Sequence, residues 1–119
     1  ALGDKKGINR AGFFVFPMDE SLSFVAIDIG GRPYSSFKAK FHRQFCGDLD
    51  TDLIGHFFES FANDLGANIT INVAYGKIDH HMVESLFKAF SKALKMAVSK
   101  DPKAKGTVPS TKGMIENFK

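Results

Sequence analysis

The spacing of apolar residues switches between two periods along this chain, and that switch constrains the fold more than any other feature. Before Leu53, apolar side chains form short runs or alternate with polar ones, which is typical of β-strands. Over 53–65 and 82–97 they recur every three or four residues, which is typical of amphipathic helices. Another alternating segment, 68–75, separates the two helical ones. The sequence therefore predicts the order strand, strand, strand, helix, strand, helix (β-β-β-α-β-α).

Three strands are predicted ahead of the first helix. Residues 13–16 form a short apolar run that Pro17 ends. Residues 21–29 carry apolar side chains on both faces, which favours a strand in the middle of a sheet. Residues 37–42 alternate apolar with basic side chains, which indicates one buried face and one basic face.

Each predicted helix has a single apolar stripe. Gly66 is placed to end the first helix, and Asp79 is placed as the N-cap of the second. A helix with one stripe buries it against one partner layer, so both helices should cover the same face of an antiparallel or mixed sheet. We therefore expect an α+β fold with two helices packed on one face of a four-stranded sheet.

Length and composition limit the functions to consider. The 119 residues suffice for one small core. A net charge of +3 allows an anionic small-molecule substrate and gives little support for nucleic-acid binding. The single cysteine, Cys46, excludes an internal disulfide and indicates a reducing compartment, so we expect a cytoplasmic protein. No apolar run approaches the ~20 residues that a membrane span needs, so no membrane partner is expected.

The sharpest local motif is a pair of histidines at the start of the second predicted helix. His80 and Glu84 are four residues apart and share one helix face, which Lys88 extends by a turn. His81 lies about 100° around the helix and points to a neighbouring site. Imidazole and carboxylate suit divalent Mn, Fe or Zn, and the helix N-terminus should keep both histidines neutral. The alternative is a solvated first turn with two surface histidines, because a site needs more than two ligands.

Several basic residues lie where they could bind phosphate. Arg10 is in the N-terminal segment, and Arg32 is in a Gly-Gly-Arg-Pro turn whose glycines let a ligand approach the backbone closely. Ser110 and Lys112, with the Thr and Gly beside them, form a candidate anion cradle near the C-terminus. Taken singly, each also fits an ordinary loop, turn or tail.

Two carboxylates and a third histidine complete the candidates. Asp19 and Glu20 stand at a strand junction, where one of them could transfer a proton if a metal lay nearby; a polar turn explains them equally well. His56 lies beside the apolar stripe of the first predicted helix. It is either a further metal ligand or a boundary histidine bonded to the backbone.

Taken together, these segments resemble imidazoleglycerol-phosphate dehydratase, the lyase of histidine biosynthesis. They occur in the family's order with compatible spacing and span nearly the whole chain. The most specific is the His-His-x-x-Glu run followed by Phe-Lys-Ala-Phe. The segments that carry the resemblance are Arg10, 17–20, 31–33, 56–58, 80–90 and 109–113.

The resemblance implies a reaction, a metal and an assembly. Family members remove water from imidazoleglycerol phosphate to give imidazoleacetol phosphate, in the cytoplasm or, in plants, the plastid. Two Mn(II) ions occupy each complete site between subunits, and the protein forms trimers and, with Mn(II), a 24-subunit homo-oligomer. The implied metal ligands are His56, His80, His81 and Glu84. The residues implied to hold the substrate, mainly its phosphate, are Arg10, Arg32, Lys88, Ser110 and Lys112.

The resemblance also implies that this chain is one half of a duplicated, two-repeat fold. Residues 1–12 would be the end of a preceding repeat and a loop, 13–100 a single α+β repeat, and 101–119 a tail with a phosphate-binding segment. The family's first repeat has no counterpart here, so we expect a fragment of the enzyme. Four ligands cannot complete two metal sites, so the missing repeat or further copies would be needed. An exposed sheet edge or apolar face should make the chain associate.

Two other functions stay open. A non-catalytic, self-associating α+β domain could keep the metal-binding residues without turnover. A basic nucleic-acid-binding module would have a similar layout, but the scattered basic residues and the absence of Trp disfavour it.

Overall fold

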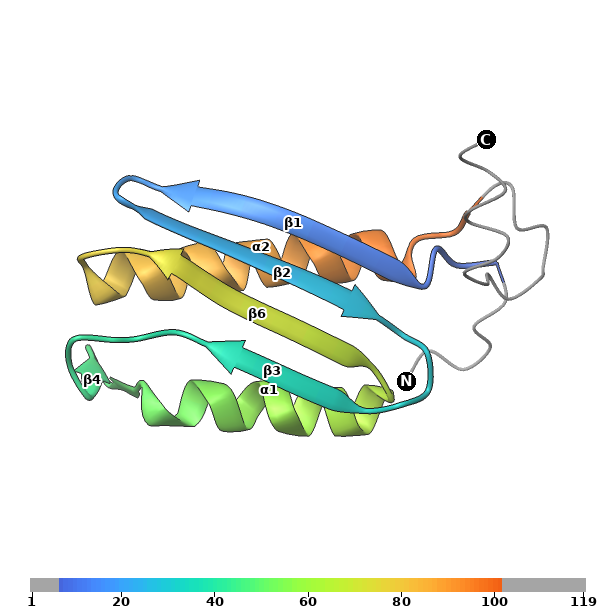
Figure 1. The fold of residues 1–119 in the computed structure, drawn as a ribbon, viewed down its shortest axis with the longest axis horizontal. Coiled ribbons are helices and arrows are strands. Elements are labelled where there is room, and N and C mark those ends of the chain that lie inside the picture. Colours follow the sequence, from blue (N-terminus) through green and yellow to red (C-terminus); the bar gives the residue numbers. More distant parts are fainter. Residues whose placement is uncertain (1–6, 102–119) are drawn as a thin grey trace.

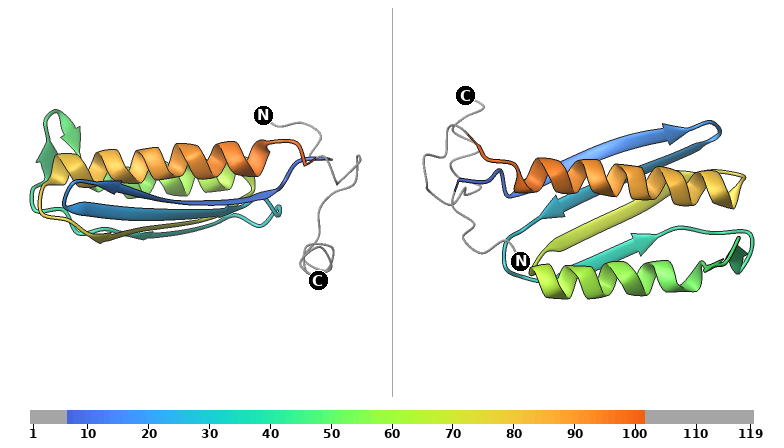
Figure 2. Two further views of the ribbon diagram at one scale, coloured as in Figure 1. Left: turned by 90° about the horizontal axis from the view of Figure 1, so that it is seen from above. Right: turned by 180° about the vertical axis from the view of Figure 1, so that it is seen from behind.

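Two helices cover one face of a four-stranded mixed sheet (Figures 1 and 2). The structure is a computed structural model that describes residues 7–101. The sheet has the order β1-β2-β6-β3, and its strands are β1 (Ala11–Met18), β2 (Ser21–Asp28), β6 (Asn68–Tyr75) and β3 (Tyr34–Lys38). The helices are α1 (Asp52–Leu65) and α2 (Asp79–Val98). The α+β class and the placement of both helices on one face are confirmed.

The sheet is mixed because β6 has an antiparallel neighbour on one side and a parallel one on the other. β1 and β2 form an antiparallel hairpin, in register from Ala11 opposite Asp28 to Met18 opposite Ser21. β2 also pairs antiparallel with β6, and β3 pairs parallel with β6. β2 therefore lies in the interior of the sheet, as the apolar residues on both of its faces predicted.

The strand boundaries differ from the prediction in several places. β1 starts at Ala11 and runs through Pro17 to Met18, because a proline is tolerated in an edge strand. β3 spans Tyr34–Lys38 rather than 37–42. A small hairpin of β4 (Phe45–Cys46) and β5 (Leu49–Asp50) precedes α1. Strands of two residues are too short to produce a periodic signal, so the sequence did not reveal them.

The helix ends agree with the prediction at one position and differ at another. Gly66 ends α1 in the left-handed region, with φ 69°, and its N–H donates to the Ala62 carbonyl. Asp79 is not the N-cap of α2, because Ile78 holds that position. The Asp79 carboxylate instead accepts the backbone N–H groups of His42 and Arg43, both at 2.8 Å. Asp79 therefore ties the loop after β3 to the start of α2.

The core lies between the sheet and the helices. Its largest fully buried side chain is Phe58 of α1, whose ring centroid lies 4.9 Å from that of Phe90 and 5.4 Å from that of Phe87 on α2. A third ring, Phe37 of β3, stacks against Phe58 at 6.0 Å. On the sheet side the core is filled by Val25, Ile27, Ile69 and Ile71. Phe58 thus joins both helices and the sheet in one cluster.

The face of the sheet away from the helices is open. This face carries Phe13, Val15 and Phe24, whose exposed fractions are 67%, 50% and 36%. Exposed apolar side chains grouped on adjacent strands are typical of association surfaces. Within residues 7–101, no helix is both long and apolar enough to cross a membrane.

Candidate functional site

The candidate residues lie at two ends of the sheet. The β1–β2 turn and the starts of both helices lie at one end (Figure 1). The residues before β1 and the loop after β2 lie at the other. The eight residues of β1 separate these ends by roughly 27 Å, at about 3.4 Å a residue. The histidine end comprises Asp19, Glu20, His56, His80, His81 and Glu84, and the arginine end comprises Arg10, Asp28 and Arg32.

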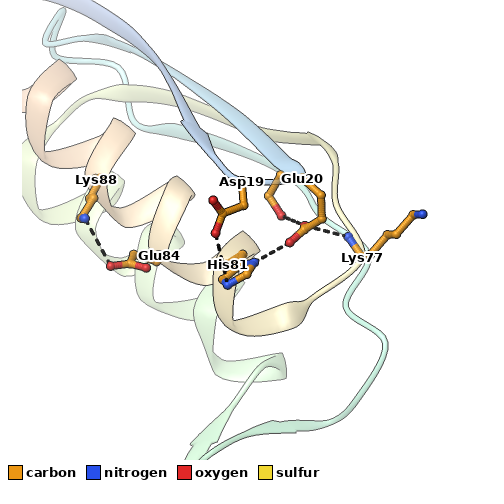
Figure 3. A network of polar contacts seen from close by, with 7 residues as sticks. Asp19, Glu20, Lys77, His81, Glu84 and Lys88 are labelled. Atoms are coloured by element: carbon orange, nitrogen blue, oxygen red, sulfur yellow. Dashed lines mark hydrogen bonds and ion pairs between the residues drawn. The ribbon is translucent and has the colours of Figure 1, made fainter.

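Glu20 accepts three hydrogen bonds at the histidine end (Figure 3). It follows Asp19 in the β1–β2 turn, where Asp19 adopts a left-handed φ of 51°. Its carboxylate accepts the Ser21 hydroxyl, the His81 Nδ1–H and, at 3.0 Å, the backbone N–H of Lys77. These three hydrogen bonds, led by that from Ser21, lower the pKa of Glu20 to about 2. Glu20 therefore joins the hairpin turn, the loop before α2 and the first turn of α2.

His81 lies between the two carboxylates of the turn. Its Nδ1 bonds Glu20, and its Nε2 lies 3.7 Å from Oδ2 of Asp19. The hydrogen bond to Glu20 raises the pKa of His81 above its usual value, and the negative charges of Glu20, Asp19 and Glu84 add to this. The helix N-terminus was expected to lower the pKa of His81; the shift is upward instead, because the nearby carboxylates outweigh the helix dipole.

His80 points to a different site from His81, as the helical spacing predicted. Its Nδ1 lies 3.7 Å from Sγ of Cys46 in the small β4–β5 hairpin. The two residues line a cavity of about 370 Å³, together with Arg43 and Lys77. The histidine neighbour of Cys46 was not predicted, because the β4–β5 hairpin that brings Cys46 close to His80 was not predicted either.

The remaining histidine-end residues lie along the helices. Glu84 pairs with Lys88 one turn further along α2, with 3.2 Å between Oε1 and Nζ. Nζ of Lys88 also lies 5.4 Å from the ring centroid of Phe16 on β1. His56 is an exposed residue near the start of α1. Lys88 is therefore held between a carboxylate and an aromatic ring.

The arginine end is built around one ion pair. Arg10 precedes β1 with a left-handed φ of 73°, and its Nε donates to Oδ1 of Asp28 at 2.7 Å. That hydrogen bond raises the pKa of Arg10, so the guanidinium stays charged. Arg32 is exposed in the loop between β2 and β3. The fold brings both arginines to one end, but that end is a strand's length from the histidine end.

Two further points bear on ligand binding. Ser110 and Lys112 lie outside the described residues. Among those described, no three His, Cys, Asp or Glu side chains gather where they could hold a metal ion. Sequence reasoning also missed two hydrogen-bond partners of Glu20, the hydroxyl of the adjacent Ser21 and the N–H of Lys77. Lys77 is 57 positions away in the sequence and comes close to Glu20 because β2 pairs with β6.

The chain is similar to enzymes that share one name. A family model described as imidazoleglycerol-phosphate dehydratase matches residues 1–94. The curated relative of that name from Chloroflexus aggregans is 50% identical over 115 residues, which are 97% of this chain and 56% of the relative. A chloroplastic relative from Arabidopsis thaliana is 44% identical over 97% of this chain and 43% of its own length. The chain thus spans about half the length of the curated relatives it matches.

Solved structures with the same name share the fold. The dehydratase from Staphylococcus aureus aligns with a TM-score of 0.81 and 39% identity, covering 84% of this chain and 58% of that one. The enzyme from Pyrococcus furiosus, solved in complex with (S)-C348, aligns with a TM-score of 0.79 and 31% identity, covering 95% and 62%. The described fold therefore corresponds to somewhat more than half of these structures.

Proposed function

The chain belongs to the imidazoleglycerol-phosphate dehydratase family, and on that premise we propose that it forms part of an enzyme that dehydrates imidazoleglycerol phosphate to imidazoleacetol phosphate in histidine biosynthesis. The observation that carries the proposal is the first turn of α2. There His80 and His81 face two neighbouring sites, and carboxylates surround His81. Imidazole and carboxylate groups placed in this way suit proton removal beside a bound metal ion.

We propose that the complete site holds two Mn(II) ions and that His56, His80, His81 and Glu84 contribute ligands. The donor types fit, because imidazole nitrogen and carboxylate oxygen suit borderline to hard divalent ions. Their number does not suffice within residues 7–101, where no three such groups gather. When bound, the metal would stabilise the negative charge left on the substrate's imidazole by removal of a proton from carbon.

Phosphate binding is proposed for Arg10, Arg32 and Lys88, and for Ser110 and Lys112 beyond the described residues. Arg10 and Arg32 lie roughly a strand's length from His81, which exceeds the size of the substrate. Within residues 7–101 of a single copy, one substrate molecule therefore cannot contact both the arginines and His81. We propose that copies of the chain, or a separate first repeat, assemble so that the arginine end of one meets the histidine end of another. A trimer that builds into a 24-subunit shell is the assembly proposed.

The chemistry then needs an acid and a base besides the metal. A proton leaves a carbon that has no neighbouring carbonyl, hydroxide departs, and the resulting enol becomes a ketone. Asp19 is the freer of the two turn carboxylates, with 74% of its side chain exposed. Glu20 already accepts three hydrogen bonds, which makes it a weak base while they last. Of the two, Asp19 is the better candidate for proton transfer.

An activity assay tests the proposal. The chain is mixed with imidazoleglycerol phosphate, with and without Mn(II), both alone and together with the part of the Chloroflexus aggregans relative that it does not cover. We expect Mn(II)-dependent product at least in the mixture, and its loss in Glu84→Ala. A mixture that assembles and binds Mn(II) but forms no product would rule out the lyase assignment.

The same assay examines the second candidate, a non-catalytic, self-associating metal-binding domain. The observation that favours it is the group of exposed apolar side chains on the open face of the sheet, Phe13, Val15 and Phe24, which is typical of an association surface. Mn(II) binding and self-association without turnover in any mixture is the result it predicts. For either function we propose a cytoplasmic location, or a plastid one in a plant, in keeping with the single cysteine.

A further inference from the structure

We propose that Glu20 is a positioning residue that fixes the ring of His81 with its proton on Nδ1 and leaves Nε2 unprotonated for a ligand. The two residues come from different parts of the chain, the β1–β2 turn and the first turn of α2 (Figure 3). Both side chains are only 27% exposed, so neither moves freely in solvent. This inference rests on the proposed function only for the identity of the ligand, a divalent metal ion.

The direction of the hydrogen bond follows from the partners of Glu20. An ionised carboxylate can only accept hydrogen bonds. Its Oε2 already accepts the Ser21 hydroxyl and the Lys77 N–H, and its Oε1 faces Nδ1 of His81. The hydrogen between Oε1 and Nδ1 must therefore belong to the histidine. In the neutral ring the other nitrogen, Nε2, then carries a lone pair.

Asp19 does not compete for this proton. Its Oδ2 lies 3.7 Å from Nε2, which is beyond hydrogen-bonding distance, and 74% of its side chain is exposed. An exposed carboxylate at that distance attracts the ring weakly and leaves its tautomer to Glu20. A carboxylate that accepts the second N–H of a metal-binding histidine is a common device, because it fixes the ring and makes the ligating nitrogen more basic.

The substitution Glu20→Gln inverts the arrangement while keeping the shape of the side chain. The amide oxygen takes the Oε2 place, because two donors, Ser21 Oγ and Lys77 N, point there. The amide NH₂ then faces Nδ1 of His81 and can only donate. His81 should respond by moving its proton to Nε2, which removes the lone pair that a metal would use.

The ring nitrogens of His81 report this change directly. We would record ¹⁵N spectra of the metal-free chain at a pH where His81 is neutral and assign its signals by their loss in His81→Asn. We expect the Nδ1–H tautomer in the parent and the Nε2–H tautomer in Glu20→Gln. The matched control is Asp19→Asn, which tolerates the left-handed φ and should leave the tautomer unchanged. An Nε2–H tautomer in the parent, or an unchanged one in Glu20→Gln, would overturn the proposal; the parent spectrum alone decides if the variant does not fold.

A metal titration separates this proposal from the proposed function. Mn(II) should bind the assembled parent about 10- to 100-fold more tightly than Glu20→Gln, as expected for loss of a group that orients a ligand. Equal affinity in the two proteins would remove the link between Glu20 and the metal. If the tautomers behave as expected but the assembled parent binds no Mn(II), the role of Glu20 stands and the metal site of the proposed function fails.

Discussion

The two ends of the sheet are held by different kinds of interaction. At the histidine end, Glu20 joins the β1–β2 turn to α2 through one histidine ring, one hydroxyl and one backbone N–H. At the arginine end, Arg10 and Asp28 form an ion pair across the open end of the same hairpin. The first arrangement includes a histidine, whose charge depends on pH and whose pKa the hydrogen bond to Glu20 raises, and the second includes a guanidinium that stays charged. The same hairpin therefore has one end that should respond to pH and one that should respond to salt.

Under the proposed function, the separation of the ends means that residues 7–101 of one copy do not bring the candidate metal ligands and the candidate phosphate-binding arginines to one substrate. The candidate metal ligands and the described candidate phosphate-binding arginines lie on the same scaffold but roughly 27 Å apart along β1. A rigid sheet cannot bend to unite them. Any ligand that needs both groups must lie between this chain and another.

The largest effect should come from breaking the core on which both ends are built. Phe58→Ala removes a fully buried ring and should lower the free energy of unfolding by about 3–5 kcal/mol. In urea denaturation of Phe58→Ala, probes at the two ends should report the same unfolding transition, with its midpoint lowered from that of the parent by the same amount at each end. The control is Phe57→Ala, a neighbour that is 47% exposed, for which we expect a smaller loss. A shift at only one end would show that the two ends unfold separately.

A glycine near the arginine end should have the next largest effect. A Cβ on Gly12 would lie 2.2 Å from the Ala93 carbonyl oxygen and 2.8 Å from the Ala97 nitrogen, so β1 would have to move off α2. We expect Gly12→Ala to cost about 1–3 kcal/mol, measured by thermal or urea denaturation.

Gly55→Ala is the matched control for Gly12→Ala. It lies in α1, where a Cβ would meet only the Phe37 ring at 3.7 Å. It should stabilise the chain by about 0.5–1 kcal/mol, since glycine is unfavourable inside a helix. Equal effects of the two substitutions would contradict the close approach of β1 to α2.

The pH dependence of the histidine end should be smaller but characteristic. The lowered pKa of Glu20 gives stability that is present above its unfolded pKa, near 4.5, and lost as pH falls towards 2. The raised pKa of His81 gives stability that is fully present below its unfolded pKa, 6.5, and lost as pH rises through the folded value. The difference in thermal midpoint between the metal-free parent and Glu20→Gln should therefore be greatest between these two unfolded pKa values. A difference that is constant from acid to alkaline pH would argue against the pair.

The smallest effect is expected from the ion pair of the arginine end. The side chains of Arg10 and Asp28 are 29% and 50% exposed, so Asp28→Asn should cost only about 0.2–1 kcal/mol at low salt. The cost should shrink as salt is added and should not change between pH 6 and 9, because Arg10 stays charged. Denaturation at low and high salt measures it. A cost that salt leaves unchanged would mean that packing, not charge, holds this end.

Much of the fold could be predicted because its signals are local. Gly66 and the apolar stripes of α1 and α2 act within a few residues, and the alternation in β6 extends over the whole strand. The β4–β5 hairpin could not be predicted, because strands of two residues are too short to show an alternating pattern. Pro17 and Asp79 were misjudged for another reason: Pro17 stands in an edge strand, and the Asp79 carboxylate bonds a loop 36 residues away in the sequence.

The sequence by itself determined which chemical groups this protein offers and that His80 and His81 face different ways, because helical geometry fixes the angle between consecutive residues. Only the tertiary structure decided the partners of those groups. The packing of the β1–β2 hairpin against α2 places Glu20 beside His81, and the β4–β5 hairpin places Cys46 beside His80. Arg10 lies far from both histidines because it is at the opposite end of β1. Contacts of this kind join residues dozens of positions apart, and local periodicity contains no information about them.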